Sequence, residues 1–156
     1  LGLVGSEMCI RDRPYGACVD HFQHWVYKNP EATPTDRKAK WLELESVYLP
    51  DRDYDDIEFA KSGGIWQGQL HIYQMPFYYI DYTLALTCAF QFWKKSEENR
   101  EKAWEDYYRL CQAGGSLPFT ELVKLARLNS PFNEGCLKSV VSKVTEWLDG
   151  VDVSAL

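Results

Sequence analysis

The sequence has none of the short motifs that would assign a catalytic chemistry directly. It contains no Gly-x-Ser-x-Gly, no P-loop and no Rossmann glycine pattern, which argues against an α/β hydrolase, an NTPase and a dinucleotide-binding enzyme. It also has no His-Glu-x-x-His pair, and its five cysteines form no Cys-x-x-Cys pair, so the chain shows neither a helix-borne zinc site nor a zinc ribbon. Strand-like alternation and internal repeats are missing too, which favours helices.

Composition sets the class of protein. The chain has 156 residues, of which 46% are hydrophobic and 26% charged, as in one globular domain with a buried core. Six tryptophans and ten tyrosines predict an interior or cleft built from large rings. The net charge of −6 argues against nucleic acid and anionic membranes as partners. An odd number of cysteines favours a reducing, cytoplasmic compartment.

The first thirteen residues are set apart from the fold. Their short apolar start lacks a basic region and is broken by Gly and Ser, so it is a poor signal peptide. The run resembles a translated sequencing-adapter read. We therefore predict an artefactual extension over 1–13, a helical domain over 14–150 and a tail over 151–156.

Apolar residues recur every three or four positions over most of this domain, which predicts an all-α fold. Pro14 is expected to open the first helix, which ends before Asn29. The run Thr33 to Asp36 has the pattern of a capping box with proline at the first helical position, and this helix should end at Pro50. Asp51 to Asp56 forms an acidic connector, resembling a calcium loop only in its charge.

The second half of the chain predicts further helices. The run from Phe77 to Trp93 is apolar almost all round, so we expect a helix buried on most sides, too short and too polar to be a membrane span. Ser96 is expected to cap the next helix, with Trp104 and Tyr107 on its inner stripe. A short helix marked by Phe119 to Ala126 and a last helix marked by Leu137 to Leu148 follow.

One histidine and a group of phenols stand out as candidate functional residues. His71, Tyr79 and Tyr82 follow a Gly63-Gly64 turn, and the tyrosines are three residues apart on a helix expected to begin near Pro76. Imidazole N–H and phenol O–H groups are suitable donors for the negative oxygen that develops on a carbonyl during hydrolysis. The alternative is that these residues only pack in the core.

A second pair of histidines is a weaker candidate. His21 and His24 are three apart on the first helix, with Cys18 and Asp20 nearby. Helical zinc ligands usually lie four apart with a glutamate between them, and neither a third ligand nor a base is evident. The alternative is a polar helix face.

Several segments together resemble the C-terminal part of oligoendopeptidase F, a member of the thimet-oligopeptidase family of zinc metallopeptidases. The resemblance extends in order from about residue 14 to about residue 150. It includes Tyr15–Asp20, Phe22–Tyr27, Asn29-Pro30, Tyr54–Asp56, Gly63-Gly64, Trp66-Gln67 and Pro76–Tyr82. The chain departs from the pattern at His21, where the family tends to carry an acidic residue.

The resemblance implies an α-helical catalytic domain that cleaves internal bonds of short peptides in a deep channel. In the family a loop with a histidine and tyrosines closes on the substrate, and it matches His71, Tyr79 and Tyr82 here as catalytic residues. The same resemblance implies substrate binding by His71, Tyr79 and Tyr82 together with Tyr78, Gly63 and Gly64; whether Tyr78 or Tyr79 faces the cleft stays open.

The same resemblance implies a zinc cofactor whose ligands are not in this chain. The family's zinc is held by a His-Glu-x-x-His helix and a later glutamate, which we expect upstream, in a missing N-terminal half of the same enzyme. The chain alone should then be inactive. The alternatives are a non-catalytic helical module that binds a peptide or partner helix, and a fragment that does not fold stably.

Overall fold

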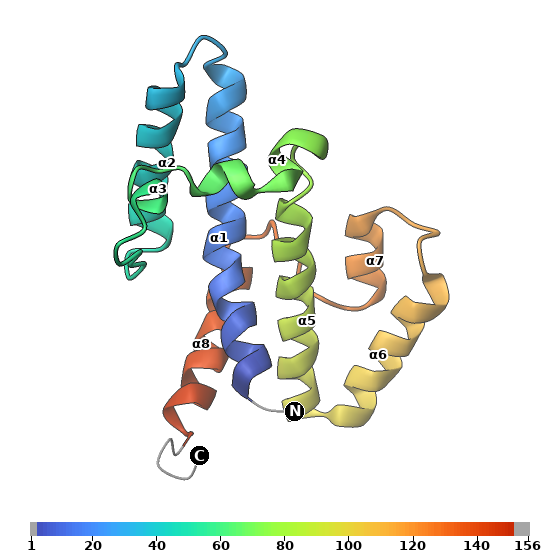
Figure 1. Ribbon diagram of the computed structural model, residues 1–156. Coiled ribbons are helices and arrows are strands. Elements are labelled where there is room, and N and C mark those ends of the chain that lie inside the picture. Colours follow the sequence, from blue (N-terminus) through green and yellow to red (C-terminus); the bar gives the residue numbers. More distant parts are fainter. Residues whose placement is uncertain (1–2, 152–156) are drawn as a thin grey trace. The chain divides into compact units, whose positions relative to one another are not determined.

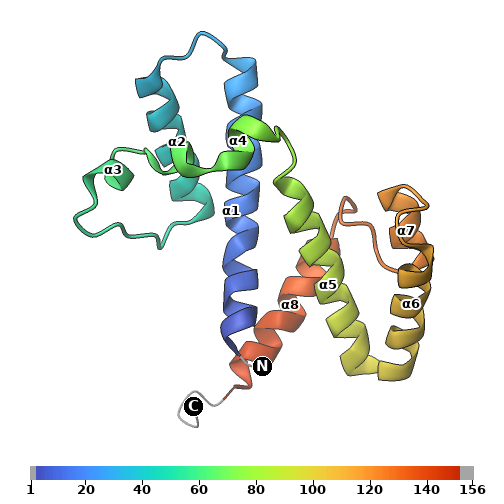
Figure 2. The same cartoon turned by 45° about the vertical axis from the view of Figure 1, so that its right-hand side comes forward.

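The computed structural model describes residues 3–151, with side chains described from Pro14 onward, and its regular elements over that range are all helical. The elements are α1 (Leu3–Lys28), α2 (Pro34–Tyr48), α3 (Glu58–Lys61), the 3-10 helix η1 (Ile65–Gly68), α4 (Leu70–Gln74), α5 (Ile80–Glu98), α6 (Arg100–Ala113), α7 (Phe119–Leu125) and α8 (Cys136–Asp149) (Figures 1 and 2). The all-α prediction is confirmed. The chain divides into two compact units, one ending at Thr83 and one beginning at Leu84.

The first unit is built on the antiparallel pair α1 and α2, which lie side by side in Figures 1 and 2. The capping box is present as predicted: the Thr33 hydroxyl accepts from the Asp36 N–H, and the Asp36 carboxylate accepts from the Thr33 N–H at 2.9 Å. The predicted start of the first helix was wrong, because α1 begins at Leu3 and continues through Pro14. Proline costs this helix one hydrogen bond, but its fixed φ is compatible with helical backbone.

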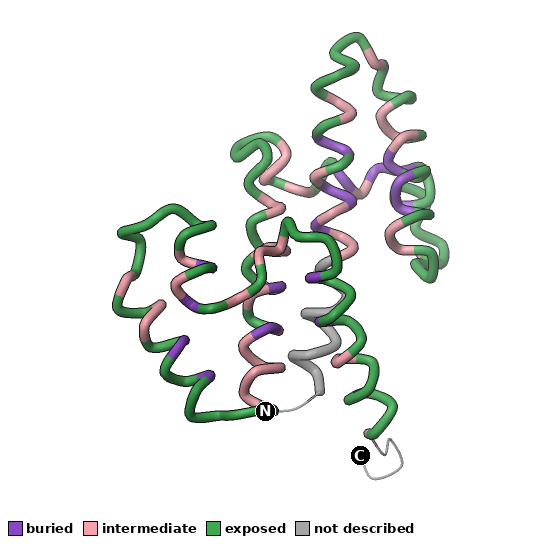
Figure 3. Tube along the Cα trace, turned by 180° about the vertical axis from the view of Figure 1, so that it is seen from behind, coloured by how far each residue is buried: buried purple, intermediate pink, exposed green. Residues whose placement is uncertain are grey.

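Aromatic rings form the core of the first unit. The buried cluster consists of Cys18, Val19, Phe22, Trp41, Leu44 and Trp66. The Phe22 ring meets Trp41 edge-on at 5.3 Å and Trp66 at 5.0 Å, arrangements that aromatic pairs prefer. In Figure 3 the buried stretches of this unit gather where α1 and α2 lie against each other. η1, which carries Trp66, is thereby anchored to this helix pair.

A glycine allows α1 to approach the first turn of α5. A Cβ built on Gly16 would lie 2.2 Å from the Thr83 Oγ1, well inside contact distance. Gly16 is buried, so the added methyl has no solvent-filled space to occupy. Because Thr83 follows Tyr82 in the chain, this close approach also sets where the Tyr82 backbone lies.

We expect Gly16→Ala to destabilise the protein. Overpacking of this kind costs about 1–3 kcal/mol. Alanine is favoured over glycine in a helix by up to about 1 kcal/mol, which offsets part of that cost. The expected net loss in the free energy of unfolding is therefore about 1 kcal/mol, measured by denaturant titration. Gly68→Ala is the matched control, because a Cβ there meets no atom within 4 Å. Equal stability of the Gly16→Ala and control variants would contradict the close approach.

The second unit differs from the sequence predictions in two ways. α5 extends to Glu98, so the Ser96 hydroxyl lies inside the helix and donates to the Trp93 carbonyl at 2.7 Å. Asn99, with extended backbone, caps α6 instead by accepting from the Lys102 N–H at 2.9 Å. The predicted cap at Ser96 was wrong, because a serine hydroxyl can bond equally well to a carbonyl of the preceding turn.

The inner face of α6 carries a carboxylate rather than the predicted rings. Trp104 is 63% exposed and Tyr107 45%, while Asp106 is fully buried. The Asp106 carboxylate accepts from the Lys95 ammonium at 2.5 Å and from the Arg109 guanidinium at 2.9 Å, and Arg127 lies at 3.6 Å. This three-cation cluster links α5 and α6 to the end of α7, which packs on α6.

The predicted burial of α5 was also wrong. Only Thr87 and Gln91 of this helix are buried within the described chain, while its larger apolar side chains are half-exposed. None of the helices in the described residues combines the length and apolarity needed to cross a membrane.

Candidate functional site

The predicted histidine and the predicted tyrosines meet in the first unit. His71 lies on the short helix α4, whose end is marked by the bond from the Met75 N–H to the His71 carbonyl at 3.0 Å. The chain then reverses at Phe77, which has a left-handed φ of 62°. This reversal brings Tyr78, Tyr79 and the first turn of α5 back over α4.

Four rings form one aromatic cluster, made up of His71, Tyr78, Tyr79 and Tyr82. The His71 ring meets Tyr79 edge-on at 5.1 Å and Tyr82 edge-on at 5.8 Å, and Tyr78 stacks parallel to it at 6.2 Å. Tyr79 and Tyr82 are 5.4 Å apart. Sequence reasoning therefore identified residues that lie in contact.

The local backbone differs from the predicted helix. α5 begins at Ile80 rather than near Pro76, so Tyr79 lies in the preceding turn. The left-handed Phe77 is the reason, since a helix cannot continue through that conformation. Tyr79 and Tyr82 still come together, because the Tyr82 N–H bonds to the Tyr79 carbonyl at 3.3 Å in the first turn.

The two adjacent tyrosines have different environments. Tyr79 is half-buried, packs against the aromatic core and meets the Tyr15 ring at 5.7 Å. Tyr78 is 39% exposed and Tyr82 51% exposed. Tyr78 and Tyr79 both contact His71. Tyr79 is packed into the protein, whereas the side chains of Tyr78 and Tyr82 are accessible to solvent.

Hydrogen bonds fix the imidazole of His71. Its Nδ1 lies 2.8 Å from the Gln69 amide nitrogen, and its Nε2 lies 3.5 Å from the Tyr82 hydroxyl. The Tyr15 hydroxyl in turn donates to the Gln69 amide oxygen at 2.9 Å. Sequence reasoning missed Tyr15 and Gln69 as site residues, because no spacing rule connects positions 54 residues apart.

The turn that carries the tyrosines is docked on α1. The Phe77 ring lies 4.8 Å from the His24 ring and 5.0 Å from the Tyr27 ring. A non-glycine residue at positive φ is strained and persists only where its surroundings hold it. These ring contacts of Phe77 supply that support and hold the turn that carries the tyrosines.

Gly63 and Gly64, which sequence reasoning placed in the substrate site, are buried against other elements. A Cβ on Gly63, whose φ is 78°, would lie 2.4 Å from the Lys38 carbonyl oxygen of α2. One on Gly64 would lie 2.6 Å from the Phe59 ring. The structure thus gives both glycines a packing role, and substrate binding by them stays a prediction.

The described side chains provide no set of ligands that fits a zinc ion. No three His, Cys, Asp or Glu side chains among them come together as a metal site. The histidines of α1 each have another partner: the His21 Nδ1 lies 3.1 Å from the Tyr48 hydroxyl, and the His24 Nε2 lies 3.5 Å from the Asp20 carboxylate. The i,i+3 spacing therefore corresponds to a polar helix face.

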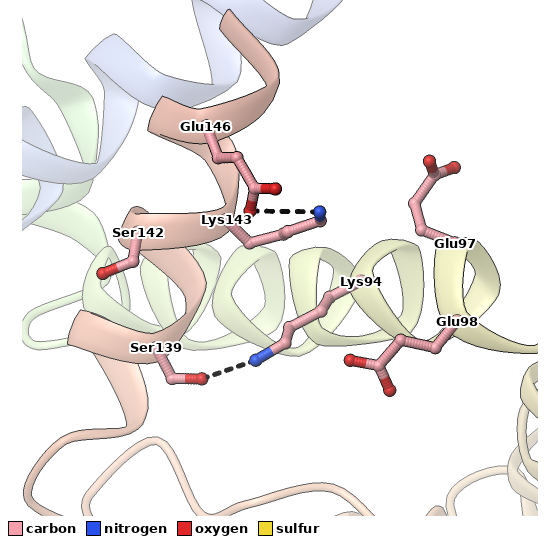
Figure 4. A pocket seen from close by; sticks show the side chains of 7 residues that line it. All are labelled: Lys94, Glu97, Glu98, Ser139, Ser142, Lys143 and Glu146. Carbon is pink, nitrogen blue, oxygen red and sulfur yellow. Dashed lines mark hydrogen bonds and ion pairs between the residues drawn. The ribbon is translucent and has the colours of Figure 1, made fainter. Parts of the chain in front are cut away.

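A hollow lies between α5 and α8 in the second unit, with a volume of about 450 Å³ (Figure 4). Charged and hydroxyl side chains line it, and both of its lysines are paired, Lys94 with Ser139 at 2.8 Å and Lys143 with Glu146 at 3.2 Å. Ligand sites are mostly apolar with a few converging polar groups. This hollow does not have that character.

Comparison with known proteins agrees with the resemblance read from the sequence. The model of peptidase family M3 matches residues 14–142. A structure solved under the name oligoendopeptidase F is 59% identical, with a TM-score of 0.86 over 92% of this chain. A structure of PZ peptidase A with an inhibitor is 57% identical, with a TM-score of 0.85 over 90% of this chain.

A more distant structure, solved as an oligoendopeptidase F from Bacillus anthracis str. Ames, is 46% identical with a TM-score of 0.74 over 96% of this chain. No curated protein matches the chain. The chain covers 25%, 25% and 23% of these three solved chains, so it spans about a quarter of the relatives that it matches.

Proposed function

Because this chain belongs to peptidase family M3 and resembles oligoendopeptidase F, we propose that it is part of a zinc-dependent oligoendopeptidase that cleaves internal bonds of short peptides. Residues 14–150 would form part of the catalytic domain, and the rest of the protein would supply the zinc site. A cytoplasmic location is proposed from the cysteine usage alone.

The aromatic cluster is the observation that supports this role. Peptide hydrolysis passes through a tetrahedral species with negative charge on the former carbonyl oxygen, and preorganised donors stabilise that charge. His71, Tyr79 and Tyr82 are three such groups whose rings touch one another and whose backbone is fixed by α4, the turn that follows it and the first turn of α5. Tyr78 and Tyr82, both partly exposed, would also contact the peptide.

Zinc enters this proposal only through the family. The sequence has no His-Glu-x-x-His pair, and we propose that the zinc ligands come from the part of the enzyme outside this chain. The residues present here would bind the peptide and stabilise charge on its carbonyl oxygen. We accordingly expect the isolated chain to be inactive.

A chimaeric enzyme tests the proposal. In this M3 chimaera, residues 14–142 replace the matching segment of the 59%-identical relative. We expect it to cleave an internal bond of a short fluorogenic peptide blocked at both ends, while the isolated chain does not. Trimming of unblocked peptides from one end only, or no cleavage by a correctly folded chimaera, would contradict endopeptidase activity.

A further inference from the structure

The imidazole of His71 is the end of a short hydrogen-bonded relay. The Tyr15 hydroxyl donates to the Gln69 Oε1 at 2.9 Å, and the Gln69 Nε2 lies 2.8 Å from the His71 Nδ1. An amide group has its acceptor and its donors on different atoms. In this arrangement Tyr15 bonds to the amide oxygen and the amide nitrogen faces His71, so the His71 Nδ1 has to accept.

This arrangement selects one tautomer of the histidine. A neutral imidazole carries a single proton, so acceptance at Nδ1 places that proton on Nε2. The His71 Nε2 lies on the side of the ring that faces Tyr82, 3.5 Å from its hydroxyl. The N–H of His71 and the hydroxyl of Tyr82 then lie close enough to approach the same oxygen atom.

We propose that Gln69, oriented by Tyr15, is a positioning residue that holds the His71 proton on Nε2, toward Tyr82 and the substrate carbonyl. The catalytic role of this relay rests on the proposed peptidase function. The relay itself is a property of this chain and can be measured without any substrate.

The backbone of Gln69 is fixed on both sides. Its N–H bonds to the carbonyl of the buried Trp66 at 3.0 Å, and its own carbonyl accepts from the Ile72 N–H at 3.1 Å. Gln69 thus ends η1 and precedes α4, with anchors in the aromatic core on either side. Its amide is therefore presented to His71 by the fold rather than by a free loop.

Tyr15 is held at the other end of the relay. Its ring meets Trp41 edge-on at 6.1 Å, and the Arg52 guanidinium lies 5.5 Å over its face. Burial, followed by the nearby Tyr79, raises the pKa of Tyr15 to about 12. Its hydroxyl consequently stays protonated at neutral pH and can continue to donate to Gln69.

Nitrogen NMR of the chain labelled at its three histidines tests the relay. Protonated and unprotonated ring nitrogens have well-separated shifts, and a His71→Gln variant assigns the His71 signals. In the unmodified chain, at a pH where the imidazoles are neutral, we expect His71 to carry its proton on Nε2. A proton on Nδ1 in the unmodified chain would overturn the proposal.

The variant Gln69→Glu should reverse the direction of the hydrogen bond between residue 69 and the His71 Nδ1. A carboxylate can only accept, so the proton of neutral His71 should move to Nδ1. His21 and His24 are internal controls, since their partners are Tyr48 and Asp20, and unchanged signals from both show that the fold is intact. Tyr15→Phe, which removes the hydroxyl alone, should give a mixture of both tautomers. No change of tautomer in either variant would overturn the proposal.

Activity of the M3 chimaera separates this inference from the proposed function. Gln69→Glu should lower kcat about tenfold to a hundredfold, by analogy with the loss seen when the partner that orients a metal-ligating histidine is removed, with little change in KM. If the chimaera cleaves no peptide while the tautomers behave as expected, the proposed function fails and the relay stands. If Gln69→Glu shifts the tautomer but leaves kcat unchanged, the catalytic purpose of the relay is wrong.

Discussion

Replacing Tyr82 by phenylalanine in the M3 chimaera is expected to reduce kcat about a hundredfold, because loss of one donor to a developing oxyanion has a cost of that order. The substitution removes a single oxygen. The ring contacts with His71 at 5.8 Å and Tyr79 at 5.4 Å can be kept, so the fold should not change. The measurement is steady-state cleavage of the blocked fluorogenic peptide.

Tyr79→Phe should have an effect of similar size, and the two variants together locate the donors. Tyr73→Phe is the matched control, because Tyr73 is an exposed tyrosine of the same segment that stacks on Trp66 at 6.0 Å outside the cluster. We expect the control to retain nearly full activity. Full activity of both Tyr79→Phe and Tyr82→Phe would show that the cluster is a packing feature only.

The largest effect on stability is expected at Asp106. Removing one partner of a buried ion pair costs about 3–5 kcal/mol, because the other charges lose their partner. Here Lys95, Arg109 and Arg127 are 23%, 36% and 57% exposed, so water compensates in part. We therefore expect Asp106→Asn to lower the free energy of unfolding by about 2 kcal/mol in denaturant titration. Glu121→Gln, at an exposed pair with Lys124, should change it by less than about 0.5 kcal/mol.

The three-cation cluster around Asp106 predicts that the protein loses stability in acid. The hydrogen bond from Lys95 is the first cause that holds the pKa of Asp106 below its usual value, and the charges of Lys95 and Arg127 add to it. A carboxyl with a depressed folded-state pKa stabilises the protein above its unfolded pKa of about 3.9. That stabilisation is lost as the pH falls through the folded pKa. The Asp106→Asn variant should lack this part of the acid dependence, and an unchanged acid profile would contradict it.

Local rules predicted much of the first unit. The capping box at Thr33 rests on side chains three residues apart, and such short-range chemistry can be read directly from sequence. The predicted contact among His71, Tyr79 and Tyr82 is also found in the structure. The two tyrosines are three residues apart, and only the end of a short helix and one turn separate His71 from them, so this grouping too is local in sequence.

Long-range and strained features could not be predicted in the same way. Nothing in the residue type of Phe77 indicates a left-handed φ, which depends on the rings of His24 and Tyr27 on another helix. The burial of Asp106 depends on Lys95 and Arg127, which lie 11 and 21 residues away in the chain. The helical spacing of apolar residues instead predicted that its neighbours Trp104 and Tyr107 would be buried.

Binding of a tetrahedral transition-state analogue tests the central claim, that the aromatic cluster stabilises charge on the carbonyl oxygen. Interactions made in the transition state should affect such an analogue far more than a ground-state peptide. In the M3 chimaera we expect Tyr82→Phe to weaken binding of a phosphinic peptide about a hundredfold, with the Kd of an uncleaved peptide of the same sequence nearly unchanged. Equal weakening of both ligands, or of neither, in Tyr82→Phe and likewise in Tyr79→Phe would contradict this role for the aromatic cluster.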